Sequence, residues 1–208
     1  MSEKEEVLQQ ISDIKSHLID KKSFVPYNYN ACYAWSGIAL ALSLLMPYAY
    51  AQGVLVGTII VFVLIAIGFT IEGIMTKKVN QSYEIDEYTK RQAFIVQSLM
   101  MIAFFLITLS AVFASYQLFT PLYLSWLAMI SLGYYIIGYT TNVKKFQHLG
   151  KFNFYLSVAL LLIAFFTHNL EGDESLFFRI TQSATILGLT ILPALITRQI
   201  KRQENCSV

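Results

Sequence analysis

The chain has 208 residues, of which 56% are hydrophobic and 13% are charged. A soluble domain of this length usually carries about 25% charged residues. One aqueous core cannot bury this much apolar surface, so the composition excludes an ordinary soluble domain and predicts a chain partly covered by lipid. The net charge of +2 is small, and two cysteines are too few for a disulfide framework.

Six apolar stretches are each long enough to cross a hydrocarbon core of about 30 Å at about 1.5 Å per residue. We therefore predict an all-α fold, a polytopic bundle of about six transmembrane helices. The stretches lie near residues 30–50, 53–75, 93–116, 121–140, 152–168 and 176–197. The predicted organisation is a cytoplasmic helix and linker over residues 1–28, a transmembrane domain over residues 29–198, and a cytoplasmic tail over residues 199–208.

The basic residues predict how the spans are oriented. Fourteen of the fifteen Lys and Arg residues fall at one end of the predicted bundle, and only Arg179 falls at the other. By the positive-inside rule, the basic end faces the cytoplasm and both termini are cytoplasmic. Another number of spans would break this pattern, so the charge distribution also supports the count of six.

Aromatic residues gather near the predicted ends of the spans. Amphipathic rings favour the headgroup region of a bilayer, so this pattern predicts an aromatic belt at each interface. The outer belt would contain Tyr48, Tyr50, Tyr116, Tyr123 and Trp126, and the inner belt Tyr27, Tyr29, Tyr139 and Tyr155.

Residues 2–20 have the pattern of an amphipathic helix. Val7, Ile11, Ile14 and Leu18 recur at spacings of four, three and four residues, which places them on one face. This face could lie on the membrane, pair with a second copy, bind a cytosolic partner, or pack against the inner loops of the protein itself. The acidic start of the helix argues against an anionic surface.

Strongly polar residues inside apolar spans are costly, which makes them candidate ligand-binding residues. Glu72 in the second span and Gln97 in the third are predicted at similar depth, where they could hydrogen-bond. Glu72 is either a proton or cation site, or a structural carboxylate paired with Gln97 or with nearby lysines. Arg179 and Gln182, at the outer end of the sixth span, are the candidates for an anionic ligand entering from outside.

The one grouping of metal-ligand residue types is His168, Glu171, Asp173 and Glu174. Its spacing matches no standard site, and a solvated acidic loop is the preferred interpretation. The sequence contains no H-E-x-x-H motif, no G-x-S-x-G motif and no P-loop. We therefore expect no enzyme activity, no cofactor and no metal. Nucleic-acid binding is not expected either, because the basic residues lie beside the bilayer.

The first span opens with Trp35, Ser36 and Gly37, a short distance after Lys22, Ser23 and Phe24. Together with the amphipathic helix, the segment over residues 23–42 resembles small uncharacterised bacterial multi-pass inner-membrane proteins that carry a cytoplasmic N-terminal helix. The resemblance implies a bacterial inner-membrane location and implies no activity.

Two hypotheses on function follow from these features. In the first, the bundle is a membrane scaffold or sensor that engages a protein partner through the N-terminal helix. In the second, it is a small solute or ion transporter or channel subunit, working as a homo-oligomer, with a polar path through Glu72, Gln97, Arg179 and Gln182. In both hypotheses we expect the protein to be embedded in a lipid bilayer.

Overall fold

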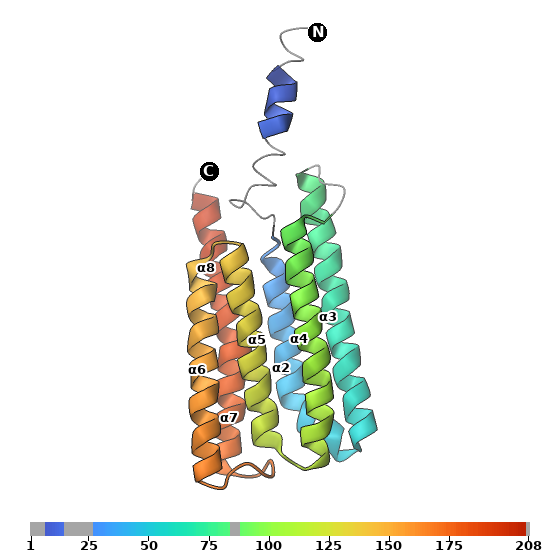
Figure 1. Ribbon diagram of the computed structural model, residues 1–208, viewed down its shortest axis with the longest axis vertical. Coiled ribbons are helices and arrows are strands. Elements are labelled where there is room, and N and C mark those ends of the chain that lie inside the picture. The colour runs from blue at the N-terminus through green and yellow to red at the C-terminus, as the bar shows by residue number, and fades with distance from the viewer. Residues whose placement is uncertain (1–6, 15–26, 84–87, 207–208) are drawn as a thin grey trace.

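The computed structural model describes residues 7–14, 27–83 and 88–206, and within these ranges it is helical with no strand (Figure 1). Six spans are long and apolar enough to cross a membrane, which confirms the predicted all-α bundle. A short helix covers residues 7–14. The spans are α2 (Asn30–Ala51), α3 (Val54–Ser82), α4 (Lys90–Ser115), α5 (Phe119–Thr140), α6 (Lys144–Phe166), and a last span made of α7 (Leu176–Ile186), the π-helix η1 (Leu187–Ile191) and α8 (Leu192–Cys206).

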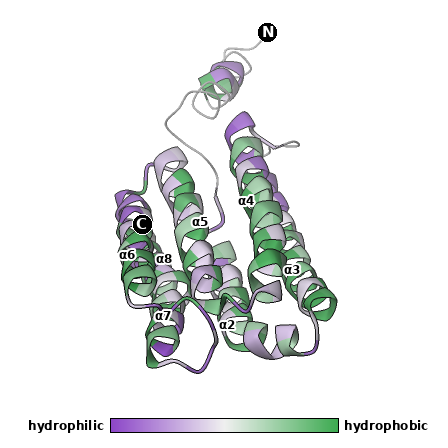
Figure 2. Cartoon of the chain, turned by 60° about the horizontal axis from the view of Figure 1, so that its bottom comes forward, coloured by the Kyte–Doolittle hydropathy of each residue, from purple (hydrophilic) through white to green (hydrophobic). Residues whose placement is uncertain are grey.

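The helices extend beyond the apolar stretches that predicted them. Helix α6 begins at Lys144, eight residues before the predicted start at residue 152, and α3 continues to Ser82, seven residues past residue 75. Hydropathy marks the apolar part of a helix, whereas backbone hydrogen bonds continue into its polar ends. Figure 2 shows this most clearly for α4, which is hydrophilic where it begins and hydrophobic along most of its length.

Helices α2, α4 and α6 begin, and α3, α5 and α8 end, at the end of the bundle that carries the clustered Lys and Arg residues. We call this the basic end, and it lies at the top of Figure 1.

Five spans form a ring, and the sixth lies outside it. Around the ring, α2 contacts α3, α3 contacts α4, α4 contacts α5, and α5 contacts α7, which returns with η1 to α2. Helix α6 packs outside the ring against α5 and α8. As a result, α5 is the most buried span, while α3 and α4 are the least buried.

Two glycines allow α5 and α6 to approach closely. A Cβ atom added at Gly150 would lie 2.6 Å from the carbonyl oxygen of Ser131, and one at Gly138 would lie 2.6 Å from the backbone nitrogen of Gln147. Small residues at such contacts let helix backbones pack tightly in membranes. Gly37 in α2 faces open space instead.

The predicted outer aromatic belt is wrong for three of its members. Tyr50, Tyr123 and Trp126 are only 6%, 0% and 6% exposed, so they lie inside the bundle. The polar atoms of Tyr123 and Trp126 find hydrogen-bond acceptors there, on Ser43 and Ser110, and so do not need the headgroup region. Tyr48 and Tyr116 remain exposed.

Candidate functional site

Pro47 lies inside α2 and determines one set of contacts between helices. Proline has no backbone N–H, so the carbonyl of Ser43, four residues earlier, loses its donor within the helix. Two side chains from other spans replace it. The Tyr123 hydroxyl of α5 donates to the Ser43 carbonyl oxygen at 2.6 Å, and the Gln182 Nε2 of α7 donates to the same oxygen at 2.7 Å. This one oxygen therefore ties three spans together.

The π-helix η1 creates the same situation beside Pro193. The Leu192 N–H bonds to the Leu187 carbonyl, five residues back. In that register the Gly188 carbonyl would need the N–H of residue 193, which is a proline. The Asn153 Nδ2 of α6 donates to the Gly188 carbonyl instead, at 3.0 Å. A side chain thus satisfies a backbone group that lipid could not.

The next carbonyl along the last span is held by α5. In the ordinary α register, the N–H that Pro193 lacks would serve the Leu189 carbonyl, four residues earlier. The Tyr134 hydroxyl donates to it at 3.2 Å. Tyr123 and Tyr134 are eleven residues apart, about three turns, so both tyrosines project from one face of α5.

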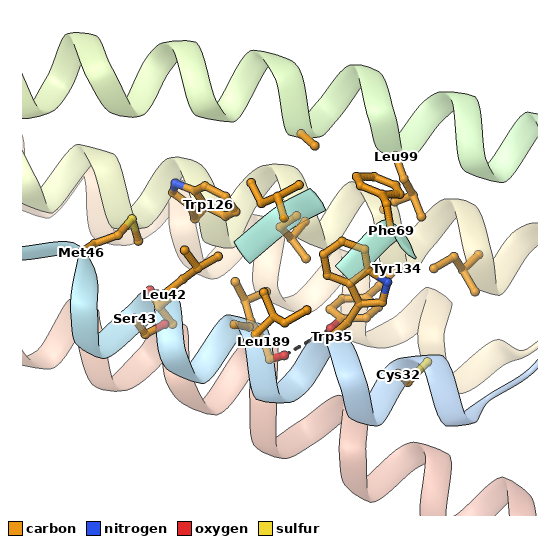
Figure 3. Close-up of a pocket in the computed structure, with 18 of the residues that line it drawn as sticks. Cys32, Trp35, Leu42, Ser43, Met46, Phe69, Leu99, Trp126, Tyr134 and Leu189 are labelled. Carbon is orange, nitrogen blue, oxygen red and sulfur yellow. Dashed lines mark hydrogen bonds between the residues drawn. The ribbon is translucent and has the colours of Figure 1, made fainter. Parts of the chain in front are cut away.

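A narrow cavity of about 70 Å³ lies inside the ring, and its lining is almost entirely apolar. Figure 3 shows Met46 and Trp126 at one end and Cys32, Trp35 and Tyr134 at the other, the basic end. Cys32 and Met46 are fourteen residues apart on α2, so the cavity follows about 21 Å of helix. The remaining lining residues include Leu42, Ile65, Phe69, Leu99, Ala103, Ile130, Gly133 and Leu189.

A buried carboxylate stands beside the basic end of this cavity. Glu72 of α3 is 4% exposed, and it is the only Asp, Glu, Lys or Arg side chain that is buried among the residues whose burial is described. The Trp35 Nε1 donates to Glu72 Oε2 at 2.8 Å. The Trp35 ring itself lines the cavity and packs edge-on against Phe69, with ring centroids 5.1 Å apart.

The four predicted polar residues do not come together. Gln97 is exposed on α4 and does not pair with Glu72, which has Trp35 as its partner instead. Arg179 is exposed on α7, and in the described residues no ion pair joins it to the acidic loop before it. Gln182 is used by the Ser43 carbonyl.

The remaining predicted sites are placed as follows. Across the described ranges, no group of three or more His, Cys, Asp or Glu residues is arranged to hold a metal ion, and His168, Glu171 and Asp173 are exposed. The apolar side chains of the helix over residues 7–14 are exposed, with values of 48% for Val7, 55% for Ile11 and 59% for Ile14. Leu18 lies outside the described residues.

The cavity residues Trp35, Trp126 and Tyr134 were not predicted as a site. The sequence does carry a signal for the framework around them, because a proline inside an apolar span frees the carbonyl four residues before it. Pro47 and Pro193 therefore mark Ser43 and Leu189 as acceptors. No signal in the sequence indicates which donors reach them, since the donors lie 80 and 55 residues away along the chain.

The chain matches no protein-family model, no curated protein and no solved structure. The resemblance to bacterial inner-membrane proteins therefore stays a prediction, and the function is argued from the geometry of the cavity.

Proposed function

We propose that this integral membrane protein is a sensor that binds one hydrocarbon chain of an amphiphilic molecule lengthwise in its central cavity. The observation that carries the proposal is the shape of the cavity, about 70 Å³ drawn out beside about 21 Å of α2. An apolar cavity of about 150 Å³ is known to hold one benzene ring. The free volume here is half of that, so a long chain lies lengthwise in the elongated cavity only when the lining side chains move apart.

The lining chemistry supports an apolar occupant over an ion or a polar solute. A path for ions needs polar groups that face it, because charge is costly in a low-dielectric interior. Gln97 and Arg179 are exposed and do not line the cavity, and Gln182 donates to the Ser43 carbonyl. None of the four residues proposed for a transport path is among the residues that line the cavity, so the transporter alternative has less support.

The N-terminal helix provides the output of such a sensor. Val7, Leu8, Ile11 and Ile14 are about half exposed, which supports a role in binding a protein partner or a second copy. By the positive-inside rule this helix is in the cytoplasm, and by the resemblance above the membrane is a bacterial inner membrane. Deleting residues 2–20 should abolish capture of the partner and leave the bundle folded. Capture that survives the deletion would remove this part of the proposal.

The chain has two tryptophans, and both line the cavity, which gives a direct binding assay. Protein in lipid nanodiscs is titrated with a terminally brominated dodecyl amphiphile, because bromine quenches tryptophan fluorescence on contact. We expect saturable quenching with unmodified protein. Simple partition into the bilayer gives quenching that rises without saturation.

Ala103→Phe fills the cavity from α4 and should abolish the saturable quenching. Val112→Phe is the matched control, since it adds a similar ring to the same helix at a side chain that is 47% exposed. The control should bind as the unmodified protein does. Equal saturable quenching in both variants, or no saturable quenching in the unmodified protein, would contradict the proposal.

A further inference from the structure

We infer that the chain bound in this cavity carries a cationic head, which the rings of Trp35 and Tyr134 and the carboxylate of Glu72 hold at the basic end. The inference rests on the proposed function and names the chemical class of its ligand, a single-chain cationic amphiphile such as an alkylamine or an alkyltrimethylammonium.

Aromatic rings surround the basic end of the cavity. Tyr27, Trp35, Phe69 and Tyr134 all line it, and they come from α2, the segment before it, α3 and α5. The face of an aromatic ring attracts a cation within about 6 Å of its centroid, and tryptophan does so best. Recognition of quaternary ammonium groups by aromatic cages uses this attraction. The opposite end has Trp126 as its aromatic lining residue.

Glu72 places a carboxyl group behind one of these rings. Its Oε2 accepts the Trp35 N–H at 2.8 Å, and no ion pair joins it to a Lys or Arg among the described residues. Lys77 and Lys78, on the same helix, are exposed. An ionised carboxylate that is 4% exposed and has no cation near it is unfavourable in a low-dielectric interior. A cationic head on the adjoining ring face would provide the missing charge.

The same geometry argues against the other head groups. The cavity lining contains no Lys and no Arg, so a carboxylate or sulfate head would meet the charge of Glu72 with nothing to offset it. An amphiphile with a neutral head would keep the apolar contacts of its chain but would lack the cation–π attraction. Cationic, neutral and anionic heads on one chain should therefore bind in that order.

The quenching assay tests this order with three terminally brominated dodecyl chains that carry a trimethylammonium, a maltoside or a sulfate head. On the unmodified protein we expect the trimethylammonium chain to bind about tenfold tighter than the maltoside chain, and the sulfate chain to bind most weakly. This comparison needs no variant. Equal affinity for all three heads would overturn the inference while leaving the proposed function intact, whereas no saturable binding of any chain would overturn both.

Glu72→Gln tests the role of the charge. The amide oxygen still accepts from Trp35, so we expect the variant to bind the maltoside chain unchanged and to lose the tenfold preference for trimethylammonium. Glu171→Gln makes the same change of charge at an exposed loop residue and should keep the preference. Glu72→Asp should restore most of it. A preference that survives in Glu72→Gln, or disappears equally in Glu171→Gln, would overturn the inference.

Discussion

The two walls of the central cavity are held together in different ways. On one side, α2, α5 and the last span are joined by side-chain donors that end on backbone carbonyls, at Ser43 and Leu189. On the other side, α3 and α4 are joined to their neighbours by pairs of side chains, Glu72 with Trp35 and Ser110 with Trp126. The second wall is also the less buried one, since α3 and α4 face outward along most of their length.

This difference follows from where the prolines lie. A carbonyl freed by proline inside a membrane must find a donor, because no water is available there. The side chain that donates to this carbonyl is then fixed in position by a backbone atom of the neighbouring helix. A hydrogen bond between two side chains can form in more combinations of rotamers, and either side chain can exchange its partner more easily. We therefore expect the first wall to be rigid and the second to adapt to an occupant.

The largest effect should come from the closest backbone contact, between α5 and α6. Gly150→Ala brings a Cβ to 2.6 Å from a backbone oxygen and should lower the free energy of unfolding by about 3 kcal/mol. Gly37→Ala, where nothing lies within 4 Å, should change it little. The free energy of unfolding of both variants is measured by unfolding them in mixed micelles with an increasing fraction of dodecyl sulfate. Similar losses at the two glycines would mean that α5 and α6 are not closely packed at Gly150.

A smaller effect should come from the Ser43 carbonyl. Tyr123→Phe with Gln182→Leu removes both donors and should lower the free energy of unfolding by about 2 kcal/mol, because a buried carbonyl is left unsatisfied. Each single variant should lose much less, since one donor remains. Pro47→Ala returns an N–H to the helix that can serve the Ser43 carbonyl. When Pro47→Ala is present, adding the two donor substitutions should therefore lower the free energy of unfolding only slightly. An equal loss with and without Pro47 would contradict the role of the proline.

The smallest effect should come from the second wall. Asn80 of α3 and Gln92 of α4 exchange amide hydrogen bonds of 3.1 and 2.8 Å near the basic end. Asn80→Leu should lower the free energy of unfolding by about 0.6 kcal/mol, the average for such bonds in membranes. Gln81→Leu, at an exposed neighbour, is the control. A loss as large as that at the Ser43 carbonyl would remove the distinction between the two walls.

Much of the fold could be predicted from the sequence, because span length, hydropathy and the positions of Lys and Arg act locally along the chain. The candidate site could not. Hydropathy does not tell which face of an apolar helix meets lipid, so the sequence predicts an interface position for Trp126 and Tyr123, which are buried. For the same reason the sequence allows a hydrogen bond between Gln97 and Glu72, whereas Gln97 is exposed in the structure. Helix rotation depends on packing across the bundle, which a single sequence does not display.

Tryptophan quenching resolved by depth tests most directly whether a chain lies lengthwise in the cavity. Trp126→Phe leaves Trp35 at the basic end, and Trp35→Phe leaves Trp126 at the other end. Each variant is saturated with dodecyltrimethylammonium that carries bromine either beside the head or at the chain terminus. We predict that bromine beside the head quenches Trp35 more strongly and that terminal bromine quenches Trp126 more strongly. Equal quenching of both tryptophans by both compounds, or the reverse pattern, would contradict the account.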